Sequence, residues 1–269
     1  MALNAPNQTQ AKPAASWMKT GAESENLAKQ EQVQYELRKA EMGKLFRFFL
    51  AKDEEARITF VDGALNAQGF LVPPRFYEHT ILIGNRWTNY VCPEHTNPGA
   101  KDKCPICESG DRPSLVGVFT VIDHRTYKST KTAGKEYSDT QKLFVAKSGT
   151  LELLQALAVK RGGLAGATWD AMRKGDKAPA VGSAFDFMEK TDIATLKAKY
   201  QHEVINPTTN AKSVQSFFVP ANYEAEIIYR TGDELRTMGI GPNAGQASGF
   251  GGGQPSQNLP QSSSYAEQL

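Results

Sequence analysis

Hydrophobic and polar positions alternate over short stretches of this chain, and the pattern predicts a mainly β protein. A half-buried strand places every second side chain toward the core, whereas a wholly buried strand carries a continuous apolar or β-branched run. One or the other pattern predicts strands over residues 57–61, 76–83, 86–91, 115–122, 142–146, 167–172, 183–188 and 213–219. We therefore expect a sheet of short strands at the centre of the fold.

A smaller number of segments carries helical signals. Helix-forming composition or helix-boundary residues predict helices over residues 24–42, 150–160, 191–200 and 223–238. Gly43 and the Gly162-Gly163 pair mark two of the C-terminal ends, because a left-handed glycine commonly stops a helix. We therefore expect an α+β protein that is mainly β with peripheral helices.

Composition divides the chain into four parts. Residues 1–22 lack periodicity and predict a disordered N-terminal arm, and residues 23–42 follow as a helix. Residues 43–239 hold the predicted strands and form the expected core. Residues 240–269 are rich in Gly, Ser and Gln and predict a flexible tail.

The three cysteines of the chain lie within sixteen residues, in Cys92-Pro-Glu-His95 and Cys104-Pro-Ile-Cys107. A structural Zn²⁺ site takes four Cys or His ligands in a closed tetrahedral shell. Disulfides suit this set less well, because three is an odd number and no signal peptide opens the chain. The spacing predicts one structural Zn²⁺ per chain, in a subdomain at about residues 76–113, with no open position for catalysis.

Two histidines could complete the zinc shell. His95 forms a Cys-x2-His knuckle with Cys92 that faces the second pair of cysteines. His79 lies on the first strand of a predicted hairpin that turns at Gly84-Asn85, so it comes near Cys92 at the end of the second strand. Both histidines can reach the metal, and local spacing alone slightly favours His95.

Basic residues gather in two segments, although the formal net charge is only +2. Residues 124–147 carry six basic and two acidic side chains, and residues 158–177 carry five and two. Clusters this modest are often ordinary solvated faces. Aromatic residues stand between the cations, however, and single-stranded nucleic acid is bound by cations that follow its phosphates and by rings that stack on its bases.

The candidate nucleic-acid contacts come mainly from three segments. The polar loop 124–141 is the first choice, the basic turn after residue 172 is the second, and the 76–91 hairpin is the third. The candidates are Arg86, Trp87, Tyr90, Arg125, Tyr127, Lys128, Lys131, Lys135, Tyr137, Lys147, Arg173, Lys174 and Lys177.

No catalytic motif accompanies the zinc pattern. The chain has no Gly-x-Ser-x-Gly elbow, no His-Glu-x-x-His motif, no phosphate-binding glycine loop and no carboxylate cluster for a two-metal site. We therefore expect a protein that is not an enzyme. No apolar run approaches the length of a membrane span, so we also expect a soluble protein.

Short strands, a central helix and a metal-bound loop inserted between strands suit a partly open barrel of the OB type. In that fold, a strand face and the adjoining loops bind oligonucleotides. The sequence therefore predicts an OB-fold-like partly open barrel with an inserted zinc-binding subdomain.

Five segments together resemble the single-stranded DNA-binding proteins of tailed bacteriophages. They are Lys44-Leu-Phe-Arg-Phe-Phe-Leu50, Tyr77-Glu-His-Thr80, Cys104-Pro-Ile-Cys107-Glu-Ser-Gly-Asp-Arg-Pro113, Val121-Ile-Asp-His-Arg125 and Lys142-Leu-Phe-Val-Ala-Lys147. The resemblance covers roughly residues 43–190. The spacing His79-x12-Cys92 is similar to that of the T4-type phage protein, with a slightly longer gap before Cys104. This resemblance implies His79 rather than His95 as the fourth ligand.

The resemblance implies an OB-fold that coats and protects single-stranded DNA during phage replication, recombination and repair. It also implies phage replication and recombination proteins as partners, recruited by a flexible C-terminus, and a location in the cytoplasm of the infected host. The tail departs from the strongly acidic tails of that family, since its only charged residue is Glu267.

Two other functions fit parts of the pattern. A zinc-stabilised scaffold or interaction protein would use the knuckle only to hold a partner interface. A zinc-ribbon subunit of a nucleic-acid enzyme would need a carboxylate cluster that the sequence does not present. Binding of single-stranded oligonucleotides separates the leading hypothesis from the first alternative, and a metal-dependent cleavage assay separates it from the second.

Overall fold

The computed structural model describes residues 19–41, 44–83, 86–97, 99, 102–128, 134, 136–205 and 212–242. The chain divides into two units, residues 1–43 and residues 44–269. In the first unit, helix α1 spans Ala22–Glu41 and carries an exposed ion pair between Glu25 and Lys29 at 3.0 Å. Residues 1–18 of the predicted arm and residues 243–269 of the predicted tail lie outside the described residues.

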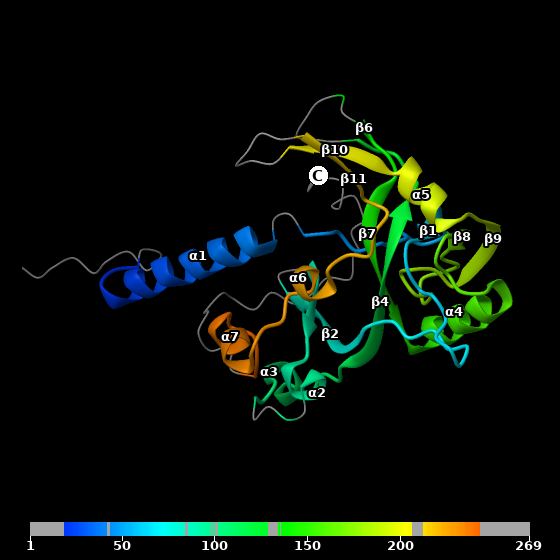
Figure 1. Cartoon of the computed structure of the whole chain (residues 1–269). Coiled ribbons are helices and arrows are strands. Elements are labelled where there is room, and N and C mark those ends of the chain that lie inside the picture. The colour runs from blue at the N-terminus through cyan, green and yellow to red at the C-terminus, as the bar shows by residue number, and fades with distance from the viewer. Residues whose placement is uncertain are drawn as a thin grey trace, which may run out of the picture. The chain divides into compact units, whose positions relative to one another are not determined.

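The second unit is built on an open antiparallel sheet (Figure 1), which has seven strands. The strands are β1 (Glu55–Phe60), β2 (Arg75–Ile83), β3 (Arg86–Val91), β4 (Ser114–Asp123), β7 (Thr140–Lys147), β8 (Ala167–Met172) and β9 (Ala184–Lys190). The expectation of a mainly β protein with peripheral helices is therefore confirmed. The sheet does not close into a barrel.

Strand β4 is the centre of this sheet. Strand β7 pairs along one edge of β4, and the opposite edge is shared by two strands in turn: β2 pairs with its first residues and β1 with its last. The order continues from β1 to β8 and β9 on one side and from β2 to β3 on the other. Because β4 is covered on both faces, its sequence is the continuous apolar run that predicted a buried strand.

The main core lies on one face of β1, β4, β7 and β8. Phe60, Phe119 and Phe144 pack ring against ring there, with Phe60 and Phe144 centroids 5.3 Å apart. Helix α4 (Ser148–Arg161) covers this core with Leu151 and Leu154, and it ends at Gly162 in the left-handed conformation, as predicted. Gly117 on β4 permits the close approach, because a Cβ there would meet Leu151 at 2.9 Å.

The C-terminal part of the chain covers the other face of β4 and β7. Tyr223 and Ile227 pack over the cluster that contains Val118 of β4 and Leu143 of β7. The backbone N–H of Ala221 donates to the Thr120 hydroxyl at 2.9 Å. Figure 1 shows this orange segment, which includes the short helix α6 (Tyr223–Glu226), running beside β7 and β4.

An extended segment without a strand label, residues 46–50 (the edge segment), lies along the free edge of β7. The N–H of Phe48 donates to the carbonyl of Leu143 at 2.8 Å, and the N–H of Leu143 donates to the carbonyl of Phe46 at 2.9 Å. The N–H of Leu50 donates to Ala180, in the loop between β8 and β9. The edge segment therefore links two parts of the sheet that do not pair directly.

The C-terminal elements differ from their prediction. The single helix predicted over 223–238 is wrong, because it divides into α6 and α7 (Gly232–Thr237), and Thr231 starts α7 with a capping box to Glu234. The predicted strand of 213–219 is shorter, β11 (Lys212–Ser216), and it pairs with the unpredicted strand β10 (Gln201–Ile205). Helix α5 (Ile193–Lys199) begins after Asp192.

Four very short elements lie in the loops of the sheet. They are the helices α2 (Pro93–Thr96) and α3 (Pro105–Glu108) and the strands β5 (Tyr127–Lys128) and β6 (Glu136–Tyr137). None of the helices in the described part of the chain combines the length and the apolar character that crossing a membrane requires.

Candidate metal centre and nucleic-acid interface

Two matching turns hold the cysteines. Cys92 and Cys104 are the N-cap residues of α2 and α3, and each is followed by a proline at the first helical position. Proline suits this position because its missing N–H would have no partner inside the helix, and its φ already matches the helix. Cys104 accepts a hydrogen bond from the N–H of Glu108 at 3.0 Å, so Cys107 is held in the same turn.

The hairpin of β2 and β3 brings His79 to these turns. His79 pairs with Tyr90, and the ladder extends one step further, to a bond from the Cys92 N–H to the Tyr77 carbonyl at 2.8 Å. His79 has no solvent exposure. The expected hairpin therefore does place His79 beside Cys92, although the two residues are thirteen positions apart in the chain.

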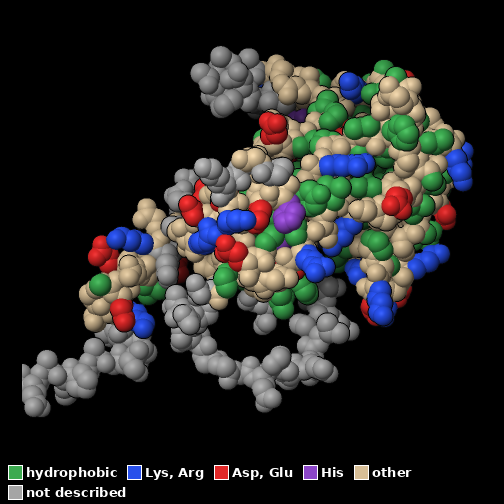
Figure 2. Space-filling model, turned by 90° about the horizontal axis from the view of Figure 1, so that it is seen from below, with side chains coloured by type: hydrophobic (Ala, Val, Ile, Leu, Met, Phe, Trp, Pro, Cys, Tyr) green, Lys and Arg blue, Asp and Glu red, His purple; other side chains and the backbone are tan. Residues whose placement is uncertain are grey.

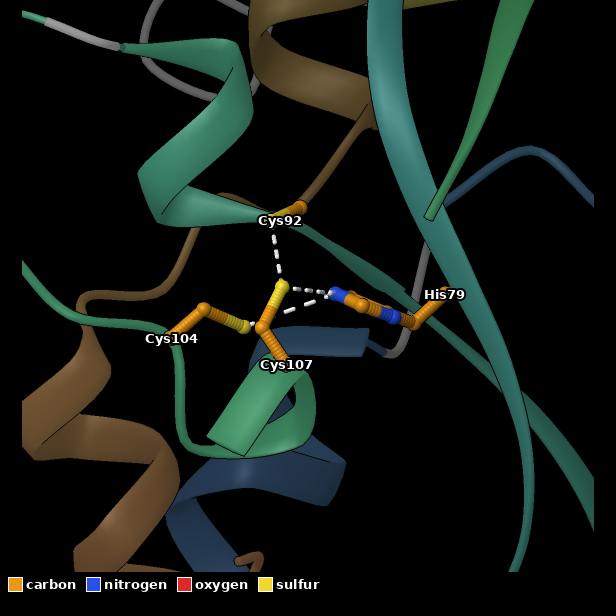
Figure 3. A group of neighbouring side chains, drawn as sticks. All are labelled: His79, Cys92, Cys104 and Cys107. Carbon is orange, nitrogen blue, oxygen red and sulfur yellow. Dashed lines mark hydrogen bonds between the residues drawn. The ribbon is translucent and has the colours of Figure 1, made fainter. Parts of the chain in front are cut away.

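The imidazole and the three sulfurs point toward one another, as Figure 3 shows. His79 Nε2 lies 3.5 Å from Cys104 Sγ and 3.4 Å from Cys107 Sγ, and the sulfurs of Cys92 and Cys107 are 3.7 Å apart. All four ligand atoms lie within 4.8 Å of one another. These four residues could hold one metal ion.

The separations fit a tetrahedral shell. Zinc–sulfur bonds of about 2.3 Å and zinc–nitrogen bonds of about 2.0–2.1 Å give tetrahedral edges of about 3.8 Å between sulfurs and about 3.6 Å between sulfur and nitrogen. Burial and the sulfurs of Cys92 and Cys104 raise the pKa of the Cys107 thiol. Three thiolates at this spacing would therefore need a cation among them to stay ionised.

Asp111 orients the histidine from outside the cluster. Its carboxylate lies 2.6 Å from His79 Nδ1. A histidine that ligates a metal commonly donates its other ring N–H to a carboxylate, which fixes the tautomer. With Nδ1–H donating to Asp111, Nε2 keeps its lone pair and faces the sulfurs.

His95, the alternative ligand, lies at the exposed side of the cluster. Its Nδ1 is 3.3 Å from Cys92 Sγ and 3.7 Å from Cys107 Sγ, and its ring contacts Tyr77. The four residues whose ligand atoms lie within 4.8 Å of one another include His79 and do not include His95.

Helix α7 covers the candidate metal cluster. Leu235 has no exposure and packs with Cys92, Cys104 and Ile106. Arg236 forms an ion pair with Glu108 of α3 at 3.0 Å. Sequence reasoning missed this contact because α7 lies more than a hundred residues after the cysteines, and its only local signal is the capping box at Thr231.

Arg125, from the first-choice loop, is already occupied. Its guanidinium contacts Asp123 at 2.8 Å and Glu54 at 2.5 Å, and it donates to the carbonyl of Phe49 at 3.0 Å. Tyr127 donates its hydroxyl to Asp123 at 2.5 Å. These contacts hold the end of β4 to the edge segment and leave the charge of Arg125 largely compensated.

The rest of that loop is only partly described. Lys128 is exposed and lies 3.5 Å from Glu136, and Tyr137 is half-buried opposite Tyr127 in the β5–β6 pair. Lys131 and Lys135 lie outside the described residues. Lys147 is exposed at the end of β7.

The basic turn between β8 and β9 contains one structural arginine and two exposed lysines. Arg173 donates to the carbonyls of Leu50, Ala178 and Asp176 at 2.9–3.1 Å. Lys174 and Lys177 are exposed. Arg125 and Arg173 thus both donate to backbone carbonyls of the edge segment, those of Phe49 and Leu50.

The hairpin candidates lie on two sides of the β2–β3 ribbon. Trp87 is 63 % exposed and pairs with the exposed Leu82. Tyr90 is half-buried and packs toward the cysteines. Arg86 is described in its backbone alone. On the face drawn in Figure 2, Lys and Arg side chains occur in small separate groups among apolar side chains and do not form one patch.

Sequence reasoning did not single out the residues of the edge segment or Lys142 as contacts. The ammonium of Lys142 lies 4.5 Å from the centre of the Tyr127 ring and 5.2 Å from that of Phe46. The sequence signals were the run Phe46-Arg-Phe-Phe49, which combines three aromatic rings with a cation, and the place of Lys142 in the basic segment 124–147.

Comparisons of this chain with family models, with curated proteins and with solved structures gave no match.

Proposed function

We propose that this protein binds single-stranded DNA without sequence preference and coats and protects it during phage DNA replication, recombination and repair. The observation that carries the proposal is the His79, Cys92, Cys104 and Cys107 cluster, inserted between two strands of an antiparallel sheet. The same combination of a metal knuckle and a β framework is what the resemblance to phage single-stranded DNA-binding proteins implies.

The strand connections support an OB-like framework. Strands β1, β4, β7, β8 and β9 occur in this order along the chain, with the β2–β3 hairpin between β1 and β4 and the short β5–β6 pair between β4 and β7. Their spatial order is β7-β4-β1-β8-β9. Helix α4 lies between the third and fourth of them. A five-stranded, partly open Greek-key arrangement of this kind binds oligonucleotides in many proteins. The metal cluster lies in the long connection from β1 to β4.

We propose Zn²⁺ as the metal. Three thiolates and an imidazole form a soft donor set that suits zinc better than calcium or magnesium, which prefer oxygen ligands. Four protein ligands would close the shell, so the ion would join the β2–β3 hairpin to α2 and α3 and would take no part in catalysis.

The exposed cations and rings are the proposed contacts. Lys128, Lys147, Lys174 and Lys177 would meet phosphates, and Trp87 would stack on a base. The segment around Tyr223 covers the face of β4 and β7 opposite the main core, so we do not place the DNA on that face. Phage replication and recombination proteins are the proposed partners, and the host cytoplasm is the proposed location.

Fluorescence anisotropy with labelled oligo-dT, a mixed-sequence single strand and a duplex of equal length tests the proposal. We expect binding to both single strands with similar dissociation constants, weaker binding to the duplex, and a linear loss of log affinity with log salt. Equal or tighter binding to the duplex, or no binding to any strand at low salt, would contradict it.

A further inference from the structure

Lys142 is a largely buried lysine that forms no ion pair with the carboxylates of the described residues. It is only 7 % exposed at the start of β7, and among the described residues no carboxylate or carbonyl receives a hydrogen bond from its ammonium. The nearest carboxylate that affects it, Asp123, is already bonded to Arg125 and Tyr127. Burial lowers the pKa of Lys142, and the charge of Arg125 acts in the same direction.

Two aromatic rings flank this ammonium. Its Nζ lies 4.5 Å from the Tyr127 ring centre and 5.2 Å from the Phe46 ring centre. A cation over a ring face is attracted by the ring quadrupole. This attraction stabilises the charge in place but satisfies none of its three N–H donors, which remain able to bind an anion.

The ring of Phe46 is held in position and is still accessible. Phe46 is 42 % exposed, although its neighbour Phe48 is buried and stacks on Phe144 at 5.7 Å. Backbone bonds fix both residues to Leu143, and Arg47 between them forms a two-bond ion pair with the buried Glu78. An exposed aromatic ring on such a fixed segment is a ready surface for stacking, because little conformational entropy is lost on binding.

We propose that Phe46, Tyr127 and Lys142 form a binding site for one nucleotide of single-stranded nucleic acid. A phosphate oxygen accepts from the Lys142 ammonium, and the adjoining base stacks on the open side of Phe46. The Tyr127 ring also lies against this ammonium, and its hydroxyl is fixed by Asp123. The site rests on the proposed function and adds to it the residues that contact the strand.

Two substitutions separate the two contacts. Phe46→Ala should weaken oligo-dT binding about 5- to 150-fold with an unchanged salt slope, because it removes a stacking surface and no charge. Phe46→Trp should restore binding. Lys142→Gln should lower the slope of log affinity against log salt by about 0.7, since one phosphate contact is lost. Lys142→Arg should keep the slope.

Phe70→Ala and Lys160→Gln are the matched controls. Phe70 is 59 % exposed in the loop between β1 and β2, and Lys160 is exposed on α4. We expect both controls to bind as the wild type does. If wild type binds oligo-dT but the Phe46 and Lys142 variants bind as tightly and with the same slope, this site is wrong while the proposed function stands.

Photocrosslinking makes the test independent of how well the variants fold. The wild-type protein is irradiated with an oligo-dT that contains bromodeoxyuridine, and the adducts are located by mass spectrometry. We expect adducts on the peptide that carries Phe46 or on the peptide that carries Tyr127. Adducts confined to other peptides would overturn the site, and no adduct together with no binding by wild type would overturn the proposed function itself.

Discussion

At the scale of single residues, the candidate metal site depends on one histidine and the carboxylate behind it. His79 has no exposure, its Nε2 faces two sulfurs, and its Nδ1 is held by Asp111. His95 is exposed and lies at one side of the group. The two histidines are therefore unequal in position, although their spacing in the chain leaves both possible.

The fourth ligand can be identified by substitution. We expect His79→Ala to lose most of its zinc on dialysis, because it removes one of four ligands, whereas His95→Ala should retain about one equivalent. Asp111→Asn should weaken metal affinity by about 10- to 100-fold through the loss of the orienting carboxylate. Metal analysis of the dialysed proteins gives the answer. Loss of zinc from His95→Ala alone would make His95 the ligand.

A second residue-scale prediction concerns Asp62, which lies under the C-terminal segment. Its carboxylate accepts from the Thr120 N–H at 3.0 Å and from the Tyr223 hydroxyl. Burial raises the pKa of Asp62 above its ordinary value, and the hydrogen bonds only partly offset this effect. The folded state therefore favours the protonated carboxyl more than the unfolded chain does.

The sign of the pH effect follows from this shift. The contribution of Asp62 to stability is fully present below the ordinary aspartate pKa of 3.8 and is lost as pH rises through the raised value. Asp62→Asn should remove this pH dependence of stability. The unfolding free energy of the variant minus that of wild type should therefore increase from acid to neutral pH. Denaturant unfolding at several pH values measures the difference, and a constant difference would contradict the prediction.

At the scale of elements, the candidate metal cluster brings together segments that lie far apart in the chain. The hairpin β2–β3, the turns α2 and α3 and the distant helix α7 all contribute to one small group around the cysteines. Very short helices such as α2 and α3 are not stable by themselves. A bound metal would therefore contribute directly to the folding of this region.

Removal of the metal should loosen this region before the sheet. With a chelator present, we expect faster amide exchange over residues 76–113 and in α7, while β1, β7 and β8 stay protected by the aromatic core. Hydrogen exchange followed by mass spectrometry, with and without chelator, measures this order. Uniform loss of protection across the second unit would show that the region has no separate stability.

At the scale of the whole molecule, the exposed cations are spread over several loops, and the net charge is low. Binding of a strand would then depend on a small number of phosphate contacts at separate places. Lys174 and Lys177, exposed between β8 and β9, are the pair that can be tested without disturbing an ion pair of the core.

Replacing both lysines with alanine should lower the slope of log affinity against log salt by about 1.4, because each of two phosphate contacts contributes about 0.7. Binding to all single strands should weaken to the same extent. Lys197→Ala combined with Lys199→Ala, on α5, is the control with the same loss of charge. Salt titrations with oligo-dT and with a mixed sequence give the slopes. An equal change in both double variants would mean that only net charge matters.

The sequence alone determined the positions of the seven strands of the main sheet and the cysteines of the candidate metal site. Alternation and β-branched runs are local properties, so β1, β2, β3, β4, β7, β8 and β9 lie close to their predicted ranges. The Cys-Pro-x-Cys spacing is local in the same way, because one turn of helix places both sulfurs. Helix α4 and its end at Gly162 also follow from local signals.

Only the tertiary structure decided which distant segments meet. The choice of His79 over His95 within the cluster depends on the register of the hairpin, and the cover of β4 by Tyr223 depends on a contact across about a hundred residues. The division of the last helix into α6 and α7 follows from the packing of Ile227 against the sheet. Arg125 and Lys142 show the same limit, since both are basic residues near the same end of the sheet. Carboxylates compensate the charge of Arg125, whereas the ammonium of Lys142 lies against aromatic rings. The order of residues does not reveal this difference, because it depends in part on neighbours that are distant in the chain.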